Sequence, residues 1–352
     1  MRRYLLFASE LYSLPILRPL ATAIRARGDE AAWFVSAQLL PWLRDDERRL
    51  ADVHAVRAFG PDAVFSANNW VPHFFPGAKA QVFHDFNVEK RAPERGHFRI
   101  RSVYDLYCTQ GPATTVPFRE LAAQRRHFAV VETGWPKLDP LFIDAAEQSL
   151  RPVDGRAVVM YAATFTEELT SARSLLTEIT RQVARGDRYW LLTLHPKSDP
   201  ALFAKYRALE GPNARFLDAT HLVSMMRAAD VLVSDTSSVV SEFIVQGKPV
   251  VTFRNRVPKP HMIDIADPAR LDEALADAFA PSAQLRASIA AYSADIHPWR
   301  DGRSGARVLA ATDALLAGDL GRLAPKPMNL WRKLQGRMRY ARWRRLADAD
   351  AD

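Results

Sequence analysis

The sequence of 352 residues contains one cysteine, Cys108, and no long run of apolar residues. A single cysteine excludes a disulfide within the chain, which is typical of proteins from a reducing compartment. No stretch approaches the about 18 uninterrupted apolar residues that indicate a membrane-spanning helix. The apolar run after Met1 ends at Glu10, so we interpret it as a first strand rather than an export signal. We therefore expect a cytoplasmic protein.

Metal ligands are also scarce. A zinc site of the usual kind needs several Cys or His ligands at short spacing, and one cysteine cannot supply them. The only Asp-x-Asp run lies in the acidic tail, at Asp348, Asp350 and Asp352. The sequence therefore predicts neither a metal ion nor a bound cofactor.

Net positive charge is nearly absent from the body of the chain. The formal net charge is +8, but residues 321–347 carry nine Lys or Arg and no Asp or Glu, and three Asp follow them. The last segment thus accounts for +6, and residues 1–320 hold only +2. Enzymes that act on nucleic acid usually spread basic charge over a groove, so we expect no nucleic-acid partner.

Short apolar runs alternate with helical stretches along the whole chain. The first series of predicted strands comprises residues 4–8, 32–35, 63–66, 81–83 and 129–132, and the second comprises 157–161, 189–194, 231–234 and 250–253. Helices are predicted over residues 16–27 and 222–229, among others. Alternating strands and helices imply parallel sheets covered by helices on both faces.

The two series predict an α/β fold with two Rossmann-like domains facing across a cleft. A polar stretch over residues 143–156 divides them. We place the domains at residues 1–145 and 146–320, followed by a basic amphipathic helix within 321–352. In such sheets, ligands bind beyond the carboxyl ends of the strands, so the residues that follow each strand carry the functional information.

Polar and basic groups follow five of the predicted strands. They lie in His84-Asp85, in Gly134-Trp135-Pro136-Lys137-Leu138-Asp139, in Tyr161-Ala162-Ala163-Thr164-Phe165, in His195-Pro196-Lys197, and in Ser234-Asp235-Thr236-Ser237-Ser238. The last motif opens a predicted helix, whose free N–H groups and partial positive charge suit a phosphate. Helix capping by Ser, Thr or Asp is the structural alternative. Glu242, one turn later, could accept hydrogen bonds from ribose hydroxyls or simply lie on a solvated face.

His84 and His195 are the candidate catalytic residues. A lone histidine at a strand end is more often structural, but these two come from opposite domains and are both expected at the cleft. Imidazole can remove a proton from an attacking hydroxyl or donate to a phosphate oxygen near neutral pH. We therefore predict a group-transfer enzyme rather than a non-catalytic nucleotide-binding protein.

In this order, the five motifs resemble those of the CDP-glycerol glycerophosphotransferases, which build teichoic-acid-type polymers. The resemblance spans residues 80–310, including Gly247-Lys248-Pro249 and Asp301-Gly302-Arg303-Ser304-Gly305. It implies a GT-B-like pair of domains and transfer of glycerol phosphate, or a related polyol phosphate, from a CDP-activated donor to a hydroxyl of a glycan or lipid-linked acceptor, with release of CMP. By position, it implies that His84 acts near the reacting phosphate and that the donor is contacted by Lys137, Thr164, Phe165, His195, Ser237, Ser238 and Glu242.

Three departures from the family pattern concern the donor. Asp85 stands where the family has Gly, Lys137 replaces Arg, and Ala163 replaces Pro. An Arg at this position can bind a phosphate through two parallel hydrogen bonds, whereas the ammonium of Lys137 is a single point charge. These departures leave the polyol open, and a GT-B glycosyltransferase that uses a nucleotide sugar for surface polysaccharide remains the alternative function.

The basic tail has a helical pattern. Leu330, Leu334 and Met338 follow helical spacing among basic residues. We interpret residues 326–345 as a contact with the anionic inner face of the cytoplasmic membrane, where each basic residue contributes about 1 kcal/mol. Packing of this helix across the N-terminal domain is the alternative, and an arm for nucleic acid is a third.

Overall fold

The structure is a computed structural model that describes residues 1–86, 98–143 and 150–338. The chain forms two compact units, Met1–Asp139 with Asp301–Asp352, and Pro140–Arg300. This division differs from the predicted domain boundary at residue 320, because helix α11 (Ser304–Ala317) belongs to the first unit, where it packs against α1 (Ser13–Ala26). The contact is close: a Cβ added to Gly305 would lie 3.1 Å from the Cβ of Ala23.

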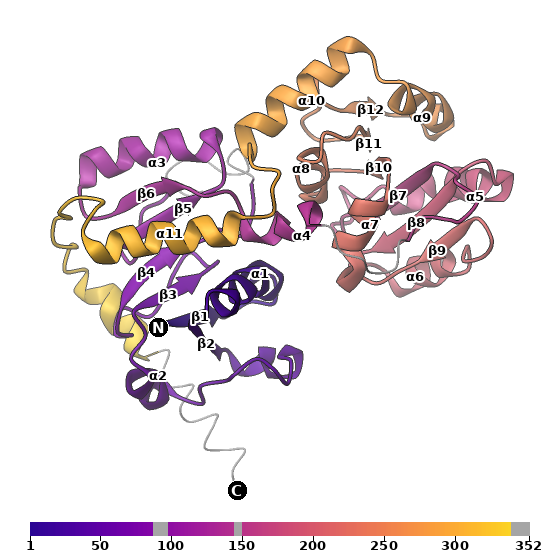
Figure 1. The fold of residues 1–352 in the computed structure, drawn as a ribbon. Coiled ribbons are helices and arrows are strands. Elements are labelled where there is room, and N and C mark those ends of the chain that lie inside the picture. Colours follow the sequence, from indigo (N-terminus) through magenta and orange to yellow (C-terminus); the bar gives the residue numbers. More distant parts are fainter. Residues whose placement is uncertain (87–97, 144–149, 339–352) are drawn as a thin grey trace, which may run out of the picture. The chain divides into compact units, whose positions relative to one another are not determined.

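The first unit contains a six-stranded parallel sheet in the order β2-β1-β3-β4-β5-β6 (Figure 1). Its strands are β1 (Arg3–Ala8), β2 (Glu30–Val35), β3 (Ala63–Ser66), β4 (Ala78–Gln81), β5 (Leu106–Thr109) and β6 (Ala129–Glu132). Besides α1 and α11, its helices are η1 (Ala37–Trp42), α2 (Val53–Phe59), α3 (Pro112–Arg125) and η2 (Pro136–Leu138), and residues 330–338 are helical as well. Leu5 and Phe7 on β1 are fully buried, as expected for a strand covered on both faces.

The second unit contains a six-stranded parallel sheet in the order β12-β11-β10-β7-β8-β9. Its strands are β7 (Val158–Ala163), β8 (Tyr189–Leu194), β9 (Ala214–Phe216), β10 (Val231–Ser234), β11 (Val250–Phe253) and β12 (Ile263–Ile265). Its helices are α5 (Ala172–Arg185), α6 (Pro200–Arg207), η3 (Ala219–His221), α7 (Leu222–Ala228), α8 (Val239–Ile244), η4 (Pro268–Arg270), α9 (Leu271–Phe279) and α10 (Ala283–Ile296), and the short α4 (Asp139–Phe142) begins at the boundary of the two units.

These two sheets confirm the predicted α/β class with two Rossmann-like domains. Most predicted strands are confirmed to within two residues, but the strand predicted at 81–83 is wrong, since β4 ends at Gln81. The prediction followed the strong β propensity of Val82 and Phe83, yet Phe83 has a φ of 56°, which no strand accommodates. Strands β5, β9 and β12 were not predicted; β9 and β12 have three residues each, too few to show a period.

None of the helices in the described ranges combines the length and the apolarity needed to cross a lipid bilayer.

Candidate functional site

In the second unit, three motifs meet at the carboxyl edge of three neighbouring strands. Thr164 follows β7, His195 follows β8 and Asp235 follows β10, and β7 lies between the other two strands in the sheet. The strand order reverses beside β7, since β8 and β9 lie on one side of it and β10 to β12 on the other. Such a switch point is where ligands bind in parallel α/β sheets. The predicted donor-binding residues of this unit therefore lie around its switch point, where a ligand is expected to bind.

Asp235 joins two of these motifs. Its carboxylate accepts the backbone N–H of Thr164 at 3.0 Å and the backbone N–H and hydroxyl of Ser171 at 2.9 Å each. The side chain is 0% exposed, and burial raises the pKa of Asp235 against the opposing effect of these hydrogen bonds. Asp235 thus fixes both ends of the loop from Thr164 to Ser171. The sequence singled out its motif for hydroxyl groups and missed this role.

His195 contacts Phe165, a second predicted donor residue. Their ring centroids are 4.3 Å apart, and the ammonium of Lys197 lies 5.6 Å from the centre of the Phe165 ring. The Nδ1 atom of His195 accepts the backbone N–H of Lys197 at 3.1 Å, so the neutral ring carries its hydrogen on Nε2. Burial, helped by the charge of Lys197, lowers the pKa of His195 and favours this neutral form. His195 can therefore offer an Nε2–H to an anionic ligand.

Ser237 and Ser238 precede the short helix α8. The Oγ of Ser237 accepts the backbone N–H of Val239 at a long 3.4 Å, and the side chain of Ser238, the N-cap residue, makes no capping hydrogen bond. Capping alone therefore accounts poorly for this pair of hydroxyls. Glu242 lies one turn further on and is only 4% exposed, so the predicted alternative of a solvated helix face is wrong.

In the first unit, His84 is presented by an unusual piece of backbone. It follows Phe83, whose φ of 56° is rare for a residue with a side chain and marks strain of the kind found at functional sites. The ring of Tyr12 stacks on the imidazole with centroids 5.1 Å apart, and the nearest carboxylate oxygen of Asp85 lies 3.8 Å from Nε2. Burial and the charges of Glu10 and Asp85 raise the pKa of Tyr12 to about 12. No pattern in the sequence pointed to Tyr12, because it lies in a loop far from His84 along the chain.

Residues from two neighbouring strand ends hold the loop that carries His84. The side chain of Gln110, after β5, donates to the carbonyl of Asp85 at 2.9 Å, and the indole of Trp135, after β6, donates to the carbonyl of Phe83 at 3.4 Å. The ammonium of Lys137 lies 5.0 Å from the centre of the Trp135 ring. His84 and Lys137 therefore belong to one connected region of the first unit, whereas the other six predicted site residues lie in the second unit.

No group of three or more His, Cys, Asp or Glu in the described part of the chain could hold a metal ion.

Comparison with known proteins finds one matching family model. The model of the family described as CDP-Glycerol:Poly(glycerophosphate) glycerophosphotransferase matches residues 85–258. This match includes every predicted site residue except His84, which immediately precedes it. No curated protein matches the sequence at a significant level.

Among solved structures, the wall teichoic acid polymerase TagF is 14% identical with a TM-score of 0.68, over 91% of this chain and 90% of that one. The MnaA protein of S. aureus, in a structure with UDP, is 13% identical with a TM-score of 0.61, over 94% and 100% of the two chains. The glycosyltransferase SnogD from Streptomyces nogalater is 14% identical with a TM-score of 0.52, over 89% and 100%. At these identities the likeness concerns the fold, and it confirms the GT-B-like fold class. The resemblance drawn from the motifs and the predicted enzyme class are confirmed as well, because the model of the CDP-glycerol:poly(glycerophosphate) glycerophosphotransferase family matches residues 85–258 of this chain.

Proposed function

We propose that the protein transfers glycerol phosphate, or a related polyol phosphate, from a CDP-activated donor to a hydroxyl of a cell-surface glycan or lipid-linked acceptor. The observation that carries this proposal is the family match over residues 85–258, which contains all six proposed site residues of the second unit. Five of these follow the adjacent strands β7, β8 and β10, namely Thr164, Phe165, His195, Ser237 and Ser238. The family match and the positions of these residues in the sheet thus support the same proposal.

The donor is held, in this proposal, by the second unit. Ser237 and Ser238 supply hydroxyl donors to the pyrophosphate, and the Nε2–H of His195 adds a third donor. Phe165, 44% exposed beside His195, offers a flat apolar surface for the cytosine base. Glu242 accepts from the ribose hydroxyls. Lys137 adds positive charge toward the phosphate that is transferred.

The reaction is a phosphoryl-group displacement. The acceptor oxygen attacks the phosphorus that bears the glycerol, a new phosphodiester bond forms, and the bond from that phosphorus to the bridging oxygen breaks. CMP leaves with the electrons of that bond, and the proton of the acceptor hydroxyl goes to His84. A base at this position typically contributes about 10²–10⁴-fold to the rate.

The proposed acceptor indicates where in the cell the reaction takes place. We propose that the protein acts in the cytoplasm at the inner face of the membrane, with residues 326–345 toward the lipid. Support comes from the exposed apolar side chains of Leu330, Trp331 and Leu334 beside basic residues of the same segment. Residues 339–345 lie outside the described residues, so this support comes from residues 326–338 alone.

The released nucleotide tests the function and its alternative. The protein is incubated with CDP-glycerol, CDP-ribitol and a panel of nucleotide sugars, each with a polyol-phosphate or glycan primer. Release of CMP, with growth of the primer by one phosphodiester unit, is the expected result. Release of UDP or GDP from a nucleotide sugar, with no CMP from either CDP compound, would instead establish a glycosyltransferase.

A further inference from the structure

The loop that follows β11 begins with strained backbone. Arg254, its first residue, has a φ of 48°, which is rare for a residue with a side chain. Two hydrogen bonds hold it there: its backbone N–H donates to the carbonyl of Ile265 at 2.9 Å, and its Nε–H donates to the carbonyl of Ala266 at 3.0 Å. Strain maintained in this way is common at functional sites. Because β11 lies next to β10, the loop starts at the sheet edge that carries the proposed donor site.

Two further hydrogen bonds attach this loop to the motif of residues 234–238. The backbone N–H of Arg256 donates to the hydroxyl of Thr236 at 2.9 Å, and the side-chain amide of Asn255 donates to the carbonyl of Asp235 at 3.2 Å. Thr236 directly precedes Ser237 in the chain. The backbone of Arg256 is therefore fixed next to the start of the serine pair proposed to bind the pyrophosphate.

The guanidinium of Arg256 is available to a ligand. The side chain is exposed, and among the described residues no carboxylate pairs with it. Other guanidinium groups of this unit are held in ion pairs, as that of Arg151 is by Asp230. The two carboxylates nearest along these hydrogen bonds have other partners: that of Asp235 accepts from the loop after β7, and that of Asp264 accepts the backbone N–H of Asn255 at 2.8 Å.

The proposed donor brings a pyrophosphate with two negative charges, and the six proposed site residues of the second unit include no Lys or Arg. His195 is neutral when its pKa is lowered, and Glu242 is an acid. Lys197 places one positive charge beside Phe165, after β8. Arg256 places a second one on the other side of β7, after β11. Its planar guanidinium can bind a phosphate through two parallel hydrogen bonds.

We propose that Arg256 binds the pyrophosphate of the nucleotide-activated donor and that Thr236 positions it. This inference rests on the proposed function and deepens it, because it adds to the donor site a residue that none of the five motifs contains. The ligand class is a nucleoside diphosphate ester. Arg256 recognises the pyrophosphate and not the base, so its contribution extends to any donor of this class.

Calorimetry with CDP-glycerol and the full chain tests the role of Arg256. The substitution R256Q should weaken binding about tenfold or more, since hydrogen bonds between ionised groups are stronger than neutral ones. R256K keeps the charge and loses the fork, so its affinity should lie between those of R256Q and wild type. R215Q is the matched control, because it removes an exposed Arg from β9, at the far edge of the same sheet. This control should bind as wild type does.

The salt dependence of binding distinguishes a ligand contact from a structural role. Wild-type affinity for CDP-glycerol should fall between about 0.1 M and about 1 M salt, where the screening length shortens from about 10 Å to about 3 Å. R256Q should show a weaker dependence on salt, because one charge that faces the ligand has been removed. R215Q should keep the dependence of wild type.

The positioning role of Thr236 is tested by a pair of variants. T236V removes the hydroxyl that accepts from Arg256 and keeps the size of the side chain, so it should weaken donor binding. T236S retains the hydroxyl and should restore the affinity. T236V should add little to the loss caused by R256Q, since both substitutions act through the same contact. Thermal unfolding checks the fold of each variant.

Three results would overturn the inference. R256Q with wild-type affinity, or with no greater loss than R215Q, would remove Arg256 from the donor site. An unchanged salt dependence in R256Q would assign its effect to structure. Fully additive losses in R256Q and T236V would show that Thr236 does not act through Arg256.

UDP-glucose separates this inference from the transferase proposal, because it carries the same pyrophosphate on another nucleotide. If wild type releases CMP from CDP-glycerol while R256Q binds that donor normally, the transferase stands and the inference fails. If wild type binds UDP-glucose and not CDP-glycerol, and R256Q weakens that binding, the proposed donor is wrong and the role of Arg256 holds. Binding of neither compound would overturn both.

Discussion

The carboxylate of Asp139 accepts the backbone N–H of Gly305 at 2.8 Å, although 166 residues separate them in the sequence. The second carboxylate oxygen accepts the N–H of Ser304 at 2.9 Å. Asp139 ends the motif that contains Lys137, and Ser304 begins α11. A carboxylate is favourable at a helix N-terminus, where N–H groups lack helical partners. This contact therefore joins two parts of the family resemblance, Gly134–Asp139 and Asp301–Gly305, into one structural element.

Substituting Asp139 by Asn should destabilise the protein by about 1–3 kcal/mol, because an amide can accept only one of the two buried N–H groups and turns a donor toward the other. Urea unfolding of wild type and Asp139→Asn measures this difference. Asp319→Asn, at the exposed far end of α11, is the control and should unfold as wild type does. A common midpoint for all three proteins would show that the Asp139 contact contributes nothing measurable.

Asp235 should act as a positioning residue for donor binding. In Asp235→Asn, the amide cannot accept from Thr164 and Ser171 together, so the loop between them loses its fixed conformation. We expect donor affinity to fall about tenfold, which corresponds to roughly 1.4 kcal/mol, about the contribution of one hydrogen bond. Ser171→Ala removes one of the donors to Asp235 and should give a smaller loss in calorimetry. A variant that unfolds more easily but binds CDP-glycerol as wild type does would reduce Asp235 to a purely structural residue.

Ser237 and Ser238 should contribute to donor binding rather than to folding. Their double substitution by Ala removes two proposed hydrogen bonds to the pyrophosphate, each worth about 0.5–1.5 kcal/mol. The stability should change little, because Ser238 makes no capping hydrogen bond with its side chain. Calorimetric titration with CDP-glycerol provides the affinity, and thermal unfolding provides the control. Unchanged affinity would remove these residues from the proposed donor site.

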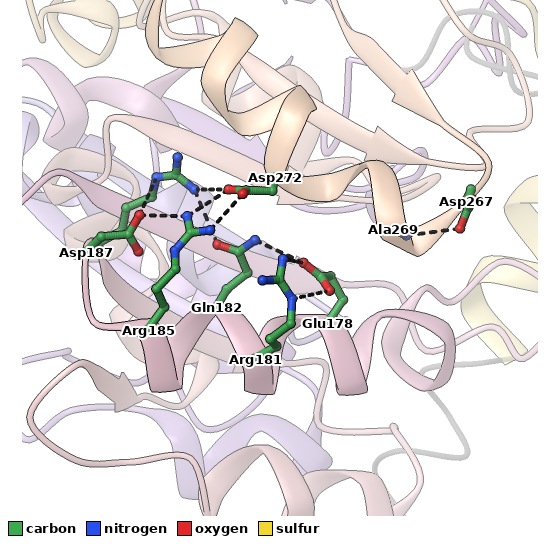
Figure 2. A network of polar contacts seen from close by, with 9 residues as sticks. Glu178, Arg181, Gln182, Arg185, Asp187, Asp267, Ala269 and Asp272 are labelled. Atoms are coloured by element: carbon green, nitrogen blue, oxygen red, sulfur yellow. Dashed lines mark hydrogen bonds and ion pairs between the residues drawn. The ribbon is translucent and has the colours of Figure 1, made fainter.

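A network of charged residues joins α5 to the start of α9 in the second unit (Figure 2). The guanidinium of Arg185 contacts both carboxylate oxygens of Asp272 at 2.7 Å, and that of Arg188 contacts one at 3.1 Å. The hydrogen bonds from Arg185 are the main reason that the pKa of Asp272 is lowered from its usual 3.8. A carboxylate whose pKa is lower in the folded state stabilises the fold above its unfolded pKa, and this contribution disappears as the pH falls.

Asp272→Asn should therefore destabilise the protein at pH 7, by about 1 kcal/mol or less because the pair is partly exposed. The difference from wild type should shrink as the pH falls below 3.8, the usual pKa of Asp272. Urea unfolding at pH 7 and pH 3 measures both values. Asp277→Asn, on the same helix, serves as the control. A difference that is independent of pH would show that the ion pair is not its source.

The sequence predicted the fold class and the location of the motifs because both depend on local patterns. Apolar runs such as Tyr189–Leu194 reveal a buried strand by themselves, and parallel strands place their carboxyl ends at one edge. Contacts made across the fold were not predictable in this way. Tyr12 stacks on His84 and Asp235 holds Ser171 only because the ends of separate strands lie close together at one edge of the sheet, and no spacing in the sequence encodes those pairs.

The two histidines should have separable roles. If His84 removes the proton of the acceptor hydroxyl, His84→Ala should reduce turnover by about 10²–10⁴-fold and leave donor affinity nearly unchanged. His195 offers an Nε2–H to the donor, so His195→Ala should weaken donor binding as well as turnover. Measuring kcat by CMP release and the dissociation constant by calorimetry for both variants tests this division.

Conservative variants sharpen the distinction. His195→Gln keeps an N–H donor near the position of Nε2, so it should recover part of the donor affinity that His195→Ala loses. His84→Gln cannot act as a base near neutral pH, so it should remain as slow as His84→Ala. Because the pKa of His195 is lowered, its ring stays neutral through the physiological range, and the donor affinity of wild type should change little between pH 7 and pH 8. If His84→Ala abolishes donor binding while His195→Ala spares it, the two roles are reversed. Full activity in both Ala variants would make these histidines structural and would remove the proposed base from the mechanism.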